Sequence, residues 1–194
     1  MARMDSCALT DGTVWLSRPT EADADRIIEC CQEPSIGEWT TIPVPYHREQ
    51  FDMFMAEFVV VGWAGRSPTW AVRTAEDGPA VGMVGLSSRD KDDPTAAEIG
   101  YWVSSQARGR GLATRATRLV CDFGFRPDGL ALIRIEWRAI VGNHASAAVA
   151  RRAGFHYEGL LRLGNLQRGI RRDCWIASRL ATDPPGPATW PPGL

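Results

Sequence analysis

Lysine is almost absent from this 194-residue chain, because Lys91 is the one basic residue of 22 that is not an arginine. The phosphate loop of nucleoside-triphosphate hydrolases needs a lysine beside its glycines, so that class is excluded. The five cysteines include no C-x-x-C pair and are odd in number. This pattern excludes a disulfide framework and a zinc site, and it favours free thiols in a reducing cytoplasm. We expect no metal.

Long apolar runs are also missing. The longest nearly apolar run, residues 58–65, is far too short to cross a bilayer. The first twelve residues hold two aspartates and no apolar core, unlike a secretory signal peptide. Hydrophobic residues make up 44% and charged residues 23%, which is ordinary for a globular domain with a real core. We therefore expect a cytoplasmic protein that does not contact a membrane.

Charge is unevenly spread along the chain. Residues 1–103 hold 8 basic and 17 acidic residues, whereas residues 104–194 hold 14 basic and 6 acidic ones. The basic half suits nucleic acid, a membrane or a phosphorylated cofactor, and it equally suits a solvated surface. No basic run interleaved with aromatic residues is present, which argues against nucleic acid as a partner.

The chain reads as one domain, residues 1–182, followed by a proline-rich tail, residues 183–194. Five prolines in that tail forbid a helix or a central strand, so it should be either loose or docked. Within the domain, hydrophobic periodicity and turn signals predict strands and helices in alternation. We expect strands near residues 14–18, 70–74, 80–87, 98–103, 133–141, 155–161 and 174–180, and helices near 20–32, 51–58, 109–123 and 146–153.

The order of these elements predicts an α/β (α+β) domain with a mixed, mostly antiparallel sheet of about seven strands and helices on both faces. Several adjacent strands lack the crossover helix that a parallel pair needs. Thr20 and Asp23 resemble a capping box at the first helix. Phe51, Phe54, Met55 and Phe58 have the spacing of one helical face and should pack in the core.

The most informative stretch is E-I-G-Y-W-V-S-S-Q-A-R-G-R-G-L-A-T, residues 98–114. Gly109 and Gly111 allow backbone N–H groups to turn toward one point at a helix start, which makes a phosphate cradle. Arg108 and Arg110 would add positive charge at its rim. A glycine-rich turn that merely caps a helix is the alternative. A dinucleotide-binding fingerprint fails, because Thr114 stands where its third glycine is required.

The spacing Gln106-x-x-Gly109-x-Gly111 fits the Q/R-x-x-G-x-G/A signature of the GCN5-related N-acetyltransferase (GNAT) superfamily. Residues 143–162, N-H-A-S-A-A-V-A-R-R-A-G-F-H-Y-E-G-L-L-R, resemble its second cofactor-binding segment. The N-x-x-S spacing, the G-F-x-x-E-G run and the pair Arg172–Asp173 resemble the RimJ/RimL-like branch, named for enzymes that acetylate ribosomal-protein N-termini. The resemblance covers about residues 12–182.

This resemblance implies the GNAT fold, splayed between its fourth and fifth strands, residues 98–103 and 133–141. It implies acetyl-CoA as cosubstrate, with the pyrophosphate on the glycine loop and the pantetheine arm between the splayed strands. The other partner would be an acceptor amine, and a homodimer stays an open alternative. The cofactor contacts that the resemblance implies are Tyr101, Trp102, Val103, Arg108, Gly109, Arg110, Gly111, Leu112, Ala113, Thr114, Asn143 and Ser146.

The implied reaction, attack of an amine on a thioester, needs a neutral amine. A general base therefore helps an α-amine, with a pKa of about 7.7–8.0, and is nearly required for a lysine, with a pKa of about 10.4. Glu98 is the best candidate base, and a strand glutamate paired with an arginine is the alternative. His47, His144 and His156 are weaker candidates. His47 is the most interesting of them, because the proline-rich segment 39–46 should approach the acceptor.

Many members of the superfamily protonate the leaving thiolate with a tyrosine seven residues after the motif asparagine. Ala150 stands there, so we expect Ser146 to substitute, with an ordered water as its rival. A backbone N–H near Val103 would stabilise the oxyanion. The predicted function is an acyl-CoA-dependent N-acyltransferase that acetylates a protein or peptide N-terminus. The alternatives are a small amine such as a polyamine, a succinyl donor, or a module that binds acyl-CoA without turnover.

Overall fold

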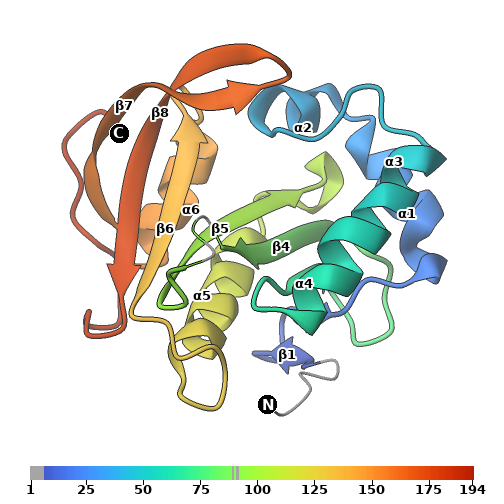
Figure 1. Ribbon diagram of the computed structural model, residues 1–194, viewed down its shortest axis with the longest axis horizontal. Helices are drawn as coiled ribbons and strands as arrows, with labels where there is room; N and C mark the ends of the chain where they lie inside the picture. The colour runs from blue at the N-terminus through green and yellow to red at the C-terminus, as the bar shows by residue number, and fades with distance from the viewer. Residues whose placement is uncertain (1–6, 89, 91) are drawn as a thin grey trace.

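The computed structural model describes residues 7–88, 90 and 92–194, and it shows one eight-stranded sheet with helices on both faces (Figure 1). The start of the chain, where we expect no secretory leader, lies partly outside these ranges. The strand order is β1-β2-β3-β4-β5-β6-β8-β7. The strands are β1 Leu9–Thr10, β2 Trp15–Ser17, β3 Thr69–Arg73, β4 Gly82–Ser87, β5 Ala96–Val103, β6 Arg134–Ile140, β7 His156–Gln167 and β8 Ile170–Leu180.

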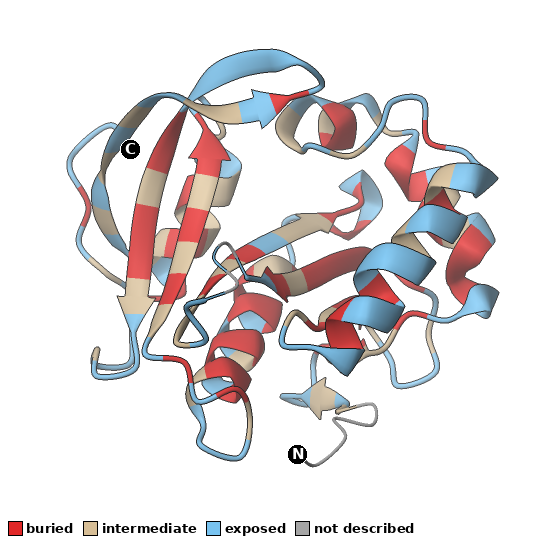
Figure 2. Cartoon of the chain, viewed as in Figure 1, coloured by how far each residue is buried: buried red, intermediate tan, exposed pale blue. Residues whose placement is uncertain are grey.

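Two groups of helices cover the sheet. The helices are α1 Ala24–Cys31, α2 Pro34–Trp39, α3 Arg48–Met53, α4 Val61–Ala64, α5 Leu112–Phe125 and α6 His144–Arg152. On one face, α5 contacts β4, β5 and β6, and the large buried cluster around Trp137 lies beneath it. On the opposite face, α1 and α3 enclose a smaller cluster that contains Ile27, Phe51 and Met83 (Figure 2).

The sheet is mixed, as predicted. Adjacent strands run antiparallel except β5 and β6, which are parallel and are connected by α5. Their register runs from Ala96–Arg134 to Ile99–Trp137 and stops there. Beyond that point β5 stays paired with β4 and β6 with β8, so the two strands part without leaving the sheet. This parting confirms the predicted splay.

The predicted strand count of about seven misses β1, a two-residue strand at the sheet edge. The last two strands are also longer than their periodicity suggested, because they continue to a turn at Arg168 and Gly169 as one hairpin. Helix α2 lies mostly in a stretch, residues 33–38, to which we assigned no element; Pro34 occupies its start, where the missing N–H is not needed. Charged and glycine-containing segments of this kind carry weak periodicity.

The predicted amphipathic helix at residues 51–58 is interrupted by a π-helical segment, Phe54–Val60. A π turn adds a residue to each turn and rotates the later side chains relative to an α-helix. Phe51 is buried as expected, but Val59 takes the core position that the α-helical spacing gave to Phe58. Phe58 is 61% exposed, so its assignment to the core was wrong.

The proline-rich tail is docked rather than loose. Trp190 is 8% exposed, and its indole N–H donates to the Phe155 carbonyl at 2.6 Å. Its ring packs against Trp137 and Tyr157 with centroid distances of 5.6 and 5.5 Å. One aromatic anchor therefore fixes a segment that has no secondary structure of its own.

We predict that Trp190→Ala lowers the free energy of unfolding by about 3 kcal/mol, as for other buried tryptophans. Thr189→Ala, at an exposed neighbour, is the matched control and should change it by less than about 0.5 kcal/mol. Urea unfolding followed by circular dichroism measures both. Equal stability of the two variants would show that the tail does not contribute to the core.

Candidate functional site: the cleft between two parted strands

A cavity of about 1090 Å³ opens where β5 and β6 part. Both strands line it, together with β4, the start of α6, helix α2 and the π-helical segment. Because β5 and β6 are parallel, their carboxyl ends meet at the same edge of the sheet, and the segments that follow them lie side by side. The glycine loop and the Asn143 turn, 30 residues apart in sequence, are brought together in this way.

The backbone of β5 offers unpaired groups to the gap. The Ser104 N–H donates to the Val81 carbonyl at 2.9 Å, and the antiparallel ladder alternates from there. The N–H and C=O of Trp102 therefore point toward β4, while those of Tyr101 and Val103 point toward the gap. Of the three β5 residues among the implied cofactor contacts, Tyr101 presents both backbone groups to the gap and Val103 its N–H, because the Val103 carbonyl accepts from Arg108.

The glycine loop has the geometry of an anion cradle. Gly109 and Gly111 have φ angles of 75° and 74°, and Gly111 caps the start of α5. In this described segment, the N–H groups of residues 109–114 have no hydrogen-bond acceptor, whereas that of Arg115 bonds to the Gly111 carbonyl. A Cβ on either glycine would meet nothing within 4 Å, so the space beside them is open. Unsatisfied N–H groups at a helix start suit phosphate.

The arginines of this loop behave differently from one another. The Arg108 guanidinium turns back into the protein, where Nε donates to the Val103 carbonyl at 2.9 Å and a terminal nitrogen donates to Ser35 at 2.9 Å. In this structure the Arg108 side chain is held at the end of β5 rather than at the loop rim, because Val103 and Ser35 offer it acceptors; its contact with phosphate stays a prediction. Arg110 is exposed, as the rim position requires. Thr114 is 8% exposed in the first turn of α5.

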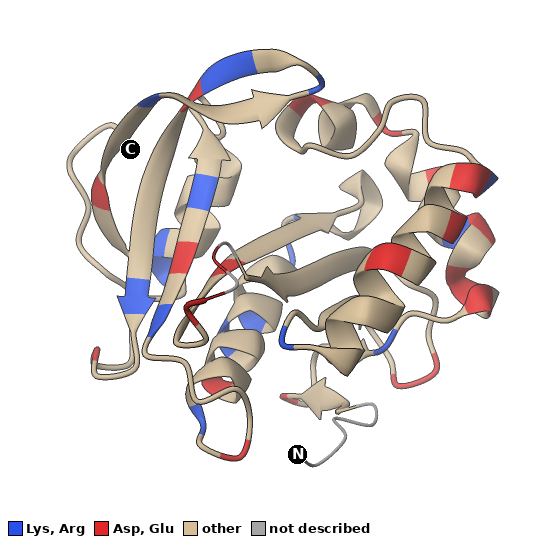
Figure 3. Ribbon diagram, in the orientation of Figure 1, with Lys and Arg blue, Asp and Glu red and all other residues tan. Residues whose placement is uncertain are grey.

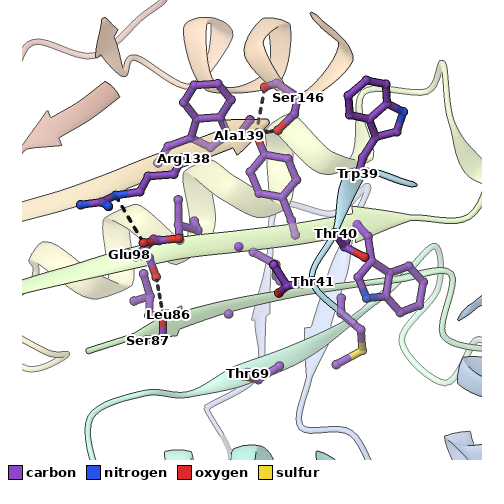
Figure 4. Close-up of a pocket in the computed structure, with 18 of the residues that line it drawn as sticks. Trp39, Thr40, Thr41, Thr69, Leu86, Ser87, Glu98, Arg138, Ala139 and Ser146 are labelled. Atoms are coloured by element: carbon purple, nitrogen blue, oxygen red, sulfur yellow. Dashed lines mark hydrogen bonds and ion pairs between the residues drawn. The ribbon is translucent and has the colours of Figure 1, made fainter. Parts of the chain in front are cut away.

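Ser146 is part of a closed hydrogen-bond group beneath the cleft (Figure 4). Its hydroxyl accepts from the Trp137 indole N–H at 3.0 Å and donates to the Tyr101 hydroxyl at 3.1 Å. The Tyr101 hydroxyl in turn donates to the Ser146 carbonyl at 3.0 Å. Burial raises the pKa of Tyr101 well above its usual range, so the phenol stays protonated at neutral pH.

Asn143 precedes α6 and caps it. Its side-chain oxygen accepts from the Ser146 N–H at 3.1 Å, which fixes the amide at the mouth of the gap. The amide nitrogen makes no hydrogen bond to a described residue, so it is available to a ligand carbonyl. Ala150, where a tyrosine is usual in the superfamily, is fully buried, and no hydroxyl replaces it at that position.

Alternation along β5 divides the site into two sides. Tyr101 and Val103 face α5 and α6, whereas Glu98, Gly100 and Trp102 face the other side of the sheet. A Cβ on Gly100 would meet nothing within 4 Å, so the middle of this second side is open space. Sequence reasoning missed Gly100, because a glycine inside a strand gives no sign of which face it leaves clear.

Glu98 lines the cavity on this second side, and its carboxylate lies 3.7 Å from Nε of Arg138. Glu98 therefore has the arginine partner of the alternative interpretation, and it also faces the cavity, as a base would have to; its role as the base stays a prediction. The same Arg138 also binds Glu136 at 3.0 Å. Trp39, Thr41, Glu57 and Phe58 complete this side.

Other candidates lie elsewhere. No histidine of the described chain lines the cavity: His47 begins α3, His144 packs against Trp175, and His156 is exposed. Burial raises the pKa of the Cys31 and Cys121 thiols to about 12, so both stay protonated and act as packing residues. The described residues contain no cluster of His, Cys, Asp and Glu that could hold a metal ion. Over the same residues, no helix is both long and apolar enough to span a bilayer.

Comparison with known proteins agrees with this geometry. A protein-family model described as an acetyltransferase (GNAT) domain matches residues 13–156. Probable N-acetyltransferase YjcK of Bacillus subtilis is 32% identical over 149 residues, which cover 70% of this chain and 81% of YjcK. YdaF of the same organism, whose name assigns it provisionally to ribosomal N-acetyltransferases, is 38% identical over 97 residues. That match spans only 50% of this chain and 51% of YdaF.

Solved structures share the fold. A probable acetyltransferase superposes with a TM-score of 0.79 at 26% identity, covering 93% of this chain and 99% of the other. Mycobacterium smegmatis RimJ, in complex with CoA-disulfide, has a TM-score of 0.77 at 24% identity, covering 91% of this chain and 87% of RimJ. RimL, described as a ribosomal L7/L12 α-N-protein acetyltransferase in complex with coenzyme A, has a TM-score of 0.77 at 18% identity, covering 91% and 98%.

We predict that Gly109→Val and Gly111→Val each weaken acetyl-CoA binding at least tenfold, because a side chain would fill the open space beside the cradle. Gly193→Val is the matched control, since Gly193 has a φ of 90° and equally open surroundings in the C-terminal tail, outside the cavity lining. Isothermal titration calorimetry measures the affinities. If all three variants bind acetyl-CoA as the parent does, the loop is not the phosphate site.

Proposed function

The chain belongs to the acetyltransferase (GNAT) family and is an acetyl-CoA-dependent N-acetyltransferase; from this premise we propose that its acceptor is the N-terminal α-amine of a protein or peptide. The observation that carries the proposal is the ion pair of the candidate base. Glu98, which lines the acceptor side of the cavity, shares Arg138 with Glu136. The Glu98 carboxylate therefore already has a guanidinium partner and is not held for the incoming amine alone.

The pKa of the acceptor amine decides how much the reaction depends on a general base. An α-amine with a pKa of about 7.7–8.0 is roughly 10–15% neutral at pH 7, whereas a lysine side chain is neutral at only about 0.04%. Deprotonating the lysine costs about 4.6 kcal/mol at 1.36 kcal/mol per pKa unit. A base paired with arginine fits the acceptor that demands less of it. The fold shared with RimJ and RimL supports the same choice.

In this proposal one side of β5 binds the cosubstrate and the other side receives the amine. The N–H of Val103 and the C=O of Tyr101 bind the pantetheine arm as a neighbouring strand would, with Asn143 holding the arm from α6. The amine approaches over Gly100 from the opposite side. Glu98 accepts its proton through water, and the Tyr101 N–H, which faces the gap nearer to Glu98, stabilises the oxyanion. Ser146, held by Trp137 and Tyr101, lies at the leaving thiolate.

The acceptor is tested with three substrates at one concentration: a peptide whose only amine is its N-terminus, the same peptide N-acetylated and bearing one lysine, and a polyamine. We expect acetylation of the first alone, with a rate that rises with pH and levels off near pH 8 as the amine deprotonates. Release of free coenzyme A thiol measures the rate. Preference for either of the other two substrates would refute the α-amine proposal.

Glu98→Gln tests the base with the same peptide. We expect a rate loss of several-fold at pH 7 that shrinks toward pH 9, because the neutral fraction of the amine rises and the base becomes dispensable. Glu136→Gln is the matched control, since it also removes a partner of Arg138 but lies outside the main cavity. Equal pH–rate profiles for the two variants would assign Glu98 a structural role only.

Substitutions at Ser146 and Asn143 should change different steady-state kinetic constants. Ser146→Ala should lower kcat about tenfold with little change in the acetyl-CoA KM, because it acts on the leaving thiolate. Asn143→Ala should mainly raise that KM, because it removes a contact with the arm. Mild and equal effects on both constants in the two variants would leave an ordered water as the acid.

A further inference from the structure

The carbonyl groups at the carboxyl end of helix α2 accept hydrogen bonds from two residues late in the chain, Gln167 and Arg168. The helix has only six residues, and the last carbonyls of a helix have no partner within it. A helix this short is marginal without tertiary support. The β7–β8 hairpin arches over the sheet and reaches α2 with its turn (Figure 1).

Gln167, the last residue of β7, supplies the first partners. Its side chain is 4% exposed, and its amide nitrogen donates to the carbonyls of Glu38 and Thr40 at 2.8 Å each. The Gly37 carbonyl lies 3.5 Å from the same nitrogen. A buried amide held by two short hydrogen bonds gives this contact one defined geometry.

Arg168, at the turn itself, supplies the rest. One guanidinium nitrogen donates to the Gly37 carbonyl at 2.7 Å, and the other donates to those of Thr40 and Ile42 at 3.2 and 3.0 Å. A cation at a helix carboxyl end is also favoured by the helix dipole. Arg168 adopts a φ of 45° and Gly169 a φ of 83°, the left-handed pair that a tight hairpin turn requires.

The segment held in this way is a wall of the cavity. Trp39, Thr40 and Thr41 all line it. The Trp39 ring lies 3.5 Å from where a Cβ on Gly142 would stand, so it reaches from α2 to the turn that precedes Asn143. Asn165, two residues before Gln167, lines the cavity from the hairpin side.

We propose that Gln167 and Arg168 form a latch that positions the α2 wall, residues 37–42, against the incoming acceptor, so that both are acceptor-positioning residues. This inference rests on the proposed function, in which the amine enters on that side of β5. The latch binds neither the glycine loop nor Asn143. Because residues 37–42 contact the cofactor side through the Trp39 ring at Gly142, opening the latch should raise the acceptor KM and change acetyl-CoA affinity by less than twofold.

Two variants open the latch with little other change. Gln167→Glu keeps the shape but replaces a donating amide with a carboxylate that faces carbonyl oxygens. Arg168→Gly removes the guanidinium and suits the positive φ, so the turn itself is preserved. Leu166→Ala is the matched control, because Leu166 is 53% exposed on the same strand and forms no hydrogen bond to α2.

Three measurements test the proposal: acetyl-CoA affinity by calorimetry, acceptor KM with the α-amine peptide, and hydrogen–deuterium exchange of residues 37–42 by mass spectrometry. In both latch variants we expect acetyl-CoA affinity within twofold of the parent, acceptor KM raised at least fivefold, and exchange of residues 37–42 at least tenfold faster. Leu166→Ala should match the parent in all three. Arg168→Lys, which keeps the charge but loses the forked donor, should be intermediate.

Two failures are distinguishable. If the parent enzyme acetylates no peptide N-terminus, the proposed function is refuted. Hydrogen–deuterium exchange of residues 37–42 still tests whether Gln167 and Arg168 hold the α2 wall. Exchange at the parent rate in both latch variants overturns the latch, whether or not an acceptor is found. Faster exchange with an unchanged acceptor KM overturns its positioning role, because the wall would then be mobile without consequence for the acceptor.

Discussion

The end of pairing between β5 and β6 after Ile99 and Trp137 is the constraint on which the rest of the structure depends. Unpaired backbone groups are costly when buried, so a sheet tolerates such a gap only if its strands are held from outside and a ligand completes it. Here β4 and β8 hold the two strands, and an amide-rich arm fits between them as an added strand. The glycine loop and the Asn143 turn lie at the open end because parallel strands finish at the same edge.

Alternation on β5 then separates the two substrates. Side chains on one face enter the hydrogen-bond group of Tyr101, Trp137 and Ser146, and those on the other face, Glu98 and Trp102, line the acceptor side. The acidic residues gather on the side of α1 and α3, and the arginines lie mainly on α5, α6 and β6–β8 (Figure 3). The charge division seen in the sequence is thus a division in space. Its basic part suits an anionic cosubstrate such as the one we propose.

The sequence predicts best those features that a short, continuous segment determines. The glycine loop and the β3–β4 hairpin each depend on a short segment, and the structure confirms both. The parting of residues 98–103 from 133–141 was implied by the family resemblance, and the structure confirms it as well. Contacts with distant partners were missed: Arg108 donates to Ser35, 73 residues away, and Gln167 donates to the Thr40 carbonyl, 127 residues away. Phe58 left the core for a local reason, because a π turn shifted the helical phase, and hydrophobic spacing does not reveal such a turn.

The proposed cofactor site and the proposed acceptor site differ in the same way, because the first lies within one stretch of the chain and the second is assembled from remote segments. The groups assigned to acetyl-CoA lie within residues 98–146, on two strands and the helix starts that follow them, so a short continuous stretch defines them. The acceptor side is assembled from α2, the π-helical segment and the β7–β8 hairpin, which are remote in sequence and meet only through tertiary contacts such as that of Gln167 with Thr40. Changes in those segments can alter the acceptor while the cofactor site is preserved. Proteins that share the glycine loop can therefore differ in the amine they accept, and in this chain we propose that the hairpin positions the acceptor by holding α2.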